Sequence, residues 1–165
     1  MFNTIKDFLF PSFPIYMLLI PFILLSSLGS CVGPSTRSEY VARECGVSTE
    51  GGTVIHESDD HGGFLGDGEM LVFIQFDDDG VTETMTESNH WRLLPLEEEL
   101  HHAIYNSFHV DMPEVTNGYY YFRNRKDDVS DRYNPAYVDV GSSWNFTAAI
   151  FDLDTNILYF IEEDT

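Results

Sequence analysis

Short apolar runs rich in β-forming side chains mark two segments of the chain, Met70–Phe76 and Trp144–Thr165. The first, MLVFIQF, is apolar at both alternating sets of positions, which is typical of a central strand. The second has an apolar run on either side of DLDTN, an arrangement that predicts a C-terminal β-hairpin. A third segment, Asn117–Arg125, reads NGYYYFRNR and predicts a turn that leads into another strand.

Helical periodicity marks the segment Pro95–Phe108. Its apolar side chains recur at every fourth position and would share one face, namely Leu96, Leu100, Ile104 and Phe108. Pro95 suits a first helical turn, and the three glutamates that follow Leu96 favour the positive N-terminal end of a helix. A second, shorter helix is predicted over Thr82–Trp91.

The order strand, helix, strand, hairpin predicts an α+β fold with a small antiparallel sheet of about four strands. One or two helices are expected to pack on a face of this sheet. Residues 32–68 are rich in Gly, Ser, Thr and Asp and predict a linker or irregular structure. The expected organisation is therefore a signal peptide over 1–30, a lipid-anchored linker and irregular segment over 31–68, and a globular domain over 69–165.

The first 30 residues differ from the rest, because Lys6 and Asp7 are their only charged side chains. The densest apolar run, Ile15–Leu25, has the length of the apolar region of a signal peptide. Two alternatives stay open for this segment. The stretch Phe8–Leu28 is long enough to span a bilayer as an uncleaved anchor, and ordinary secretion without an anchor is the other alternative.

The residues Leu28-Gly29-Ser30-Cys31 resemble a bacterial lipobox, in which an aliphatic residue and two small residues precede a cysteine. The resemblance implies cleavage after Ser30 and attachment of a diacylglycerol to the Cys31 sulfur. Acyl chains add about 0.8 kcal/mol of membrane affinity for each buried methylene. The mature chain would then be held at the extracytoplasmic face of the cell membrane through Cys31.

Cys45 is the only other cysteine. A disulfide with Cys31 is the simplest pairing in an oxidising compartment, but a thioether-linked lipid on Cys31 forbids it. Under the lipoprotein hypothesis Cys45 is a lone thiol, and no neighbouring residues suggest that it is activated for catalysis.

The net charge of −20 lies entirely in residues 31–165. Such a surface repels nucleic acid and anionic lipid head groups, so the expected partners are neutral or cationic components of the cell envelope or other proteins. The many aromatic residues in the same region argue against disorder.

Three motifs resemble known metal sites without meeting their requirements. In HESDDH the histidines His56 and His61 are five residues apart, whereas the zinc-protease motif needs four. The residues Asp152, Asp154, Asn156 and Glu163 fit an EF-hand loop, but Ile157 replaces the glycine that such a loop requires, and a hairpin turn explains the same residues. Glu99-x-x-His102 has the spacing of a di-iron helix, and a solvent-exposed histidine is the simpler interpretation.

The segments HGGFLGDGEM, WRLLPL, NGYYYF and NFTAAIFDLDTNILYFIEEDT together resemble uncharacterised exported domains of Gram-positive bacteria. This resemblance implies no particular activity. The predicted function is a membrane-anchored binding or accessory module without chemistry or a cofactor of its own. The alternative is a small cell-surface hydrolase or metal-dependent enzyme, for which His56, His61 and Asp67 are the residues to test first.

Overall fold

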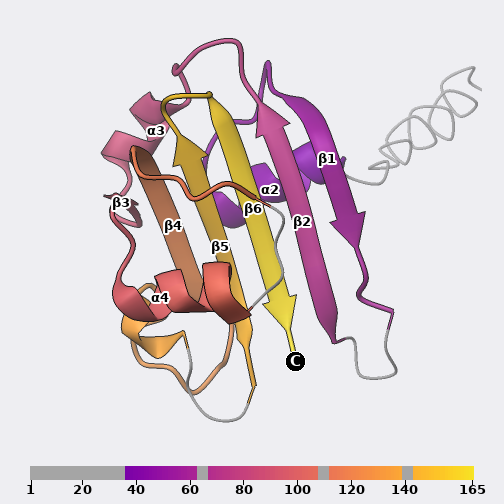
Figure 1. The fold of residues 1–165 in the computed structure, drawn as a ribbon, viewed down its shortest axis with the longest axis vertical. Helices are drawn as coiled ribbons and strands as arrows, with labels where there is room; N and C mark the ends of the chain where they lie inside the picture. Colours follow the sequence, from indigo (N-terminus) through magenta and orange to yellow (C-terminus); the bar gives the residue numbers. More distant parts are fainter. Residues whose placement is uncertain (1–35, 63–66, 108–111, 139–142) are drawn as a thin grey trace, which may run out of the picture. The chain divides into compact units, whose positions relative to one another are not determined.

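The computed structural model describes residues 36–62, 67–107, 112–138 and 143–165. In this part of the chain six antiparallel strands form one sheet in the order β1-β2-β6-β5-β4-β3 (Figure 1). The strands are β1 (Thr53–Asp59), β2 (Gly68–Gln75), β3 (Trp91–Leu93), β4 (Gly118–Asn124), β5 (Asn145–Asp152) and β6 (Ile157–Asp164).

The predicted central strand and the predicted C-terminal hairpin are both confirmed. β2 lies between β1 and β6, and its residues from Met70 to Ile74 are buried. β5 and β6 pair directly, with Asp152 opposite Ile157 at the turn. The Asp152 carboxylate accepts hydrogen bonds from the Asp154 N–H at 2.9 Å and from the Thr155 hydroxyl at 2.7 Å. Asp152 of DLDTN therefore serves the hairpin turn, the Asp154 carboxylate accepts a hydrogen bond from the Asn117 side chain at 2.7 Å, and Glu163 lies near the far end of β6.

Helices pack on both faces of the sheet, not on a single face as predicted. On one face α2 (Arg37–Cys45) and α3 (Thr82–Glu87) contribute to an apolar cluster with β2 and β6. On the other face lies α4 (Glu98–His102), which continues as the π-helical turn Ala103–Ser107. Figure 1 shows α4 in front of the sheet and α2 behind it.

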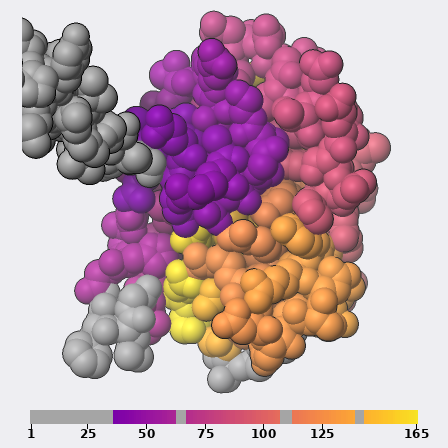
Figure 2. Space-filling model, turned by 180° about the vertical axis from the view of Figure 1, so that it is seen from behind, coloured from indigo at the N-terminus to yellow at the C-terminus, as the bar shows by residue number. Residues whose placement is uncertain are grey.

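The alternation of side chains along the strands separates two apolar clusters. Val72 and Phe160 face α2, whereas Leu71 and Tyr159 face α4. From behind, α2 and the segments around α3 and after β4 cover much of the sheet (Figure 2). Since both faces carry buried apolar side chains, the sheet is the middle layer of the fold.

The sheet has six strands, whereas about four were predicted. The two additional strands, β1 and β3, were not predicted because neither has an apolar pattern in the sequence. All seven residues of β1 are exposed, so no alternation of buried and exposed positions marks it. β3 has only three residues. The prediction of irregular structure over 32–68 is wrong for α2 and for β1. The start of α2 does carry a local signal, a capping box in which Thr36 and Glu39 bond to each other's backbone N–H.

The two predicted helices exist but are shorter than expected. α3 ends at Glu87, and Trp91 belongs to β3. α4 begins at Glu98 and not at Pro95, which follows a cis peptide bond. Leu100 and Ile104 are fully buried, as the periodicity predicted. None of the described helices is long and apolar enough to cross a membrane.

Candidate functional site

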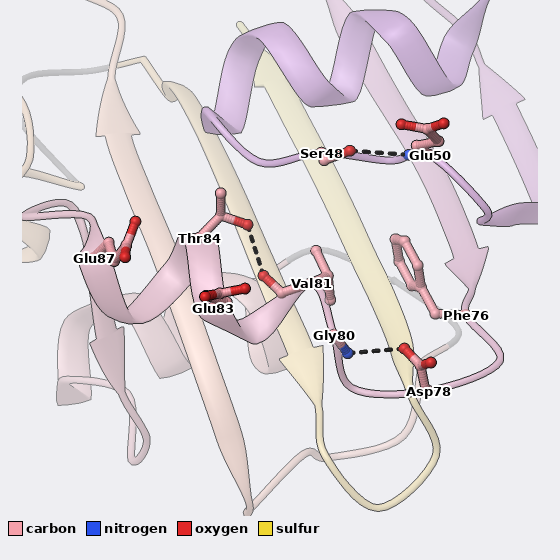
Figure 3. Close-up of a pocket in the computed structure, with 9 residues that line it drawn as sticks. All are labelled: Ser48, Glu50, Phe76, Asp78, Gly80, Val81, Glu83, Thr84 and Glu87. Carbon is pink, nitrogen blue, oxygen red and sulfur yellow. Dashed lines mark hydrogen bonds between the residues drawn. The ribbon is translucent and has the colours of Figure 1, made fainter.

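An open cleft of about 500 Å³ lies between the loop after α2, the end of β2 and the segment that contains α3 (Figure 3). Three parts of the chain that are distant in sequence meet there. The lining residues are Ser48, Glu50, Phe76, Asp78, Gly80, Val81, Glu83, Thr84 and Glu87. We call this hollow the acidic cleft.

The loop that carries Ser48 and Glu50 passes close to β2 at Gly52, where the lack of a side chain leaves room for this approach. A Cβ atom at Gly52 would lie 2.5 Å from the Ile74 side chain and 3.0 Å from the Phe76 ring. Any larger residue would push the loop away from the sheet. The Ser48 hydroxyl accepts a hydrogen bond from the Glu50 N–H at 3.3 Å, which orders the loop locally. The lack of a side chain at Gly52 therefore allows this loop, with Glu50, to pass close to Phe76.

The opposite wall is built by the turn after β2 and by α3. The Asp78 carboxylate accepts a hydrogen bond from the Gly80 N–H at 2.9 Å, and the Thr84 hydroxyl donates to the Val81 carbonyl at 2.8 Å. These bonds fix the path of the chain into α3. Glu83 and Glu87 are four residues apart and therefore lie on one side of this helix.

The acidic cleft carries four carboxylates and no basic side chain. Glu50, Asp78, Glu83 and Glu87 are all exposed, whereas Phe76 and Val81 are buried and form its apolar part. Fields from carboxylates in one concave surface add together, so the cleft attracts positive charge. Its apolar part suits a cation that also has a hydrocarbon portion.

The carboxylates of the cleft are not assembled as a metal site. Among the described residues, only His61, Glu162 and Asp164 bring three ligand atoms within 4.8 Å of one another, and they lie at the other end of β2. A cation in the acidic cleft would therefore be held by the general field and by individual carboxylates.

Ion pairs already occupy the group of His61, Glu162 and Asp164. The Arg125 guanidinium bonds Glu162 at 2.7 Å and also bonds Asp164. The Tyr40 hydroxyl on α2 donates to the second oxygen of Glu162 at 2.7 Å. A positive side chain thus already pairs with two of the three groups that could hold a metal. We interpret this group as a structural ion-pair network that fastens α2 to the sheet.

The histidines singled out in the sequence contact different groups. The His56 ring lies on Phe73, with 4.7 Å between the ring centroids. His61 bridges two carboxylates, with Nδ1 2.9 Å from Asp59 and Nε2 3.4 Å from Asp164. Asp67 is exposed directly before β2. Neither histidine lines the acidic cleft, and neither does Asp67.

A smaller hollow of about 400 Å³ lies along α4. It is lined by Glu98, Glu99, His102, Val138 and Trp144. His102 is exposed, as its place opposite the apolar stripe of the helix predicted. The Glu99-x-x-His102 motif therefore lies at the surface and not in the core of a helical bundle, where di-iron sites are built.

Of the two cysteines, the structure describes only Cys45. Cys31 lies outside the described residues. Cys45, at the end of α2, carries a free thiol that is only 2% exposed, and burial raises its pKa well above the usual value. The thiolate is the reactive form of cysteine, and a raised pKa keeps Cys45 in the thiol form. We therefore interpret Cys45 as a residue that packs in the apolar core. Its backbone carbonyl accepts a hydrogen bond from the Trp91 indole at 2.9 Å.

Comparison with protein-family models, with curated proteins and with solved structures finds no match for this chain.

Sequence reasoning missed the acidic cleft because carboxylates are abundant along the whole chain. Glu83 and Glu87 belong to a helix that was predicted, and the run Asp77–Gly80 was interpreted only as the end of a strand. Glu50 comes from a segment that was predicted to be irregular. A four-residue spacing of glutamates was the one available signal, and it does not indicate what faces them.

Proposed function

We propose that this chain is a membrane-anchored extracytoplasmic lipoprotein whose folded part is a non-enzymatic binding module. In this proposal the acidic cleft receives a cationic group of a partner molecule. The observation that carries the proposal is the charge of the cleft, in which four carboxylates surround a partly apolar hollow without any basic residue. The net charge of −20 extends the same preference over the whole surface.

The contacts of the remaining reactive groups support binding over catalysis. His61 and its neighbouring carboxylates are engaged with Arg125 and Asp59, and the Cys45 thiol is buried. Catalysis needs an activated nucleophile, a base or a metal beside a substrate site. The acidic cleft supplies carboxylates and the hydroxyls of Ser48 and Thr84, and the Thr84 hydroxyl already donates to the Val81 carbonyl.

A charge-matched pair of variants tests the cleft. We would measure binding of trilysine amide to the full chain in mild detergent by calorimetry, at low and high salt. Glu83→Gln with Glu87→Gln should weaken binding about tenfold, since two of four cleft carboxylates are lost. Glu98→Gln with Glu99→Gln removes the same charge from α4 and should change binding by less than about twofold.

Two results would contradict the binding proposal. If both double variants weakened trilysine binding equally, the attraction would come from the overall charge and not from the cleft. If hydrolase substrates were turned over, with or without zinc, and the turnover were lost on substitution of His56, His61 or Asp67, the enzyme alternative would replace it.

The anchor is tested independently of the cleft. Intact-mass analysis of membrane-extracted protein should show a chain that begins at Cys31 and is heavier by the mass of its acyl groups. A mature chain with an unmodified Cys31, or with Cys31 bonded to Cys45, would exclude the lipoprotein proposal and leave the cleft proposal standing.

A further inference from the structure

The two edges of the sheet are protected to very different degrees. β3, at one edge, has only three residues, and very short edge strands discourage pairing with other chains. β1, at the other edge, has seven residues, and all of them are exposed. Figure 1 shows β1 as the outermost strand, on the side opposite β3. The β1 edge is therefore the one that offers room for an added strand.

The composition of β1 also favours pairing. It contains no proline and no lysine, the residues that commonly guard an edge. Val54 is 37% exposed and Ile55 is 52% exposed, and both are β-branched residues suited to strands. The one protective feature is a shift in the pairing register with β2 between Val54 and His56, which marks Ile55 as a bulge.

Charge decides which kind of strand fits. Arg37 pairs with both Glu57 and Asp59, so one positive charge faces two negative charges at the end of β1. The start of β1 follows directly from the loop that carries Glu50 of the acidic cleft. An extended segment beside β1 would run about 24 Å from the cleft to these carboxylates.

We propose that β1 is a docking edge that adds an extended, lysine- or arginine-bearing segment of a partner protein to the sheet. Main-chain hydrogen bonds would supply affinity, and basic side chains would meet the acidic groups at both ends of the strand. This inference rests on the proposed function for the cationic character of the partner. A second copy of the chain fits poorly, because each copy carries a net charge of −20.

A pair of backbone-matched peptides tests the docking edge. The first alternates valine and lysine over seven residues, the length of β1, with capped ends. The second has the same side chains but carries an N-methyl group on every residue, so that neither of its edges can pair with a strand. The first peptide should bind the full chain and protect the amides of residues 53–59 from hydrogen exchange, and the second should bind at least about tenfold more weakly.

A pair of edge variants tests the location. Ile55→Lys places a positive charge on the proposed edge and should weaken binding of the alternating valine-lysine peptide at least about tenfold. Leu93→Lys makes the same kind of change on β3, where Leu93 is 68% exposed, and should alter binding by less than about twofold. Thermal unfolding of both variants confirms that the fold is kept.

Three results would overturn the docking edge. Equal binding of the N-methylated peptide would show that charge alone holds the segment. An unchanged affinity in Ile55→Lys would place the segment elsewhere. Self-association that Ile55→Lys abolishes would make a second copy the occupant. In each case the trilysine experiment with Glu83 and Glu87 still decides the cleft proposal separately.

Discussion

Glu69 on β2 and Glu163 on β6 are direct cross-strand partners in the sheet. Their side chains share the face that α4 covers, and Glu163 is only 6% exposed. Burial raises the pKa of Glu163 to about 7, and the nearby carboxylates of Glu69, Asp60 and Asp164 act in the same direction, opposed by His61. Two acids placed side by side in this way make the stability of the sheet depend on pH.

The first prediction concerns that dependence. An unfolded glutamate loses its proton near pH 4.5, whereas Glu163 in the folded chain keeps it to about pH 7. Between these values the folded state holds more protons, so Glu163 lowers the free energy of unfolding as pH rises from about 4.5 to 7. Glu163→Gln should remove this loss and stabilise the chain by about 1 kcal/mol at pH 8, after allowance for solvent screening.

Denaturant unfolding at pH 4 and pH 8 checks the prediction. The stability gained by Glu163→Gln should be larger at pH 8 than at pH 4. Glu98→Gln, an exposed glutamate on α4, serves as the control. A gain that is equal at both pH values would show that the Glu163 carboxyl does not carry the effect.

The second prediction concerns the ion-pair network under α2. Arg125→Ala would leave Glu162, which is 6% exposed, without its guanidinium partner, and should destabilise the fold by about 3 kcal/mol. Arg132→Ala removes the same side chain from a pair in which Asp127 is fully exposed, and should cost less than about 0.5 kcal/mol. Similar losses for the two variants, measured by denaturant unfolding, would contradict a structural role for the network.

The third prediction concerns the start of β4. Gly118 has a φ of +153°, and a Cβ atom there would lie 1.9 Å from the Phe151 carbonyl oxygen of β5. Gly118→Ala should therefore force the strands apart and cost about 2–4 kcal/mol. At Gly62 the nearest atom to a new Cβ is 3.7 Å away, so Gly62→Ala should stay within about 0.5 kcal/mol. A Gly118→Ala variant that unfolds like the parent chain would show that the strand can shift freely.

The fourth prediction concerns the thiols. In the native protein Cys45 should react with a thiol reagent at least about 100-fold more slowly than in denaturant, since it is buried and its pKa is raised. In denaturant one thiol should be counted for each chain if Cys31 carries a lipid. Two thiols would indicate an unmodified Cys31, and none would indicate a disulfide between the cysteines.

The sequence by itself determined the elements that are rich in apolar residues. Met70–Ile74 and the two strands of the C-terminal hairpin are continuous apolar runs that are buried on both faces of the sheet, and the helix around Leu100 carries an apolar side chain at every fourth position. Asp152 of DLDTN was correctly assigned to a turn, because its carboxylate bonds the Asp154 N–H and the Thr155 hydroxyl within that turn. The sequence is also the source of the hypothesis that Cys31 is lipidated, and Cys31 lies outside the described residues.

Only the tertiary structure decided the remaining features, because they depend on residues that are far apart along the chain. β1 is exposed throughout and becomes a strand only through its pairing with β2. The acidic cleft forms where the loop with Glu50 meets α3 with Glu83 and Glu87. Arg125, which follows β4, pairs with Glu162 and Asp164 of β6 across the intervening strand β5. Local periodicity records which residues are buried, whereas such long-range pairings are set by the way the elements pack.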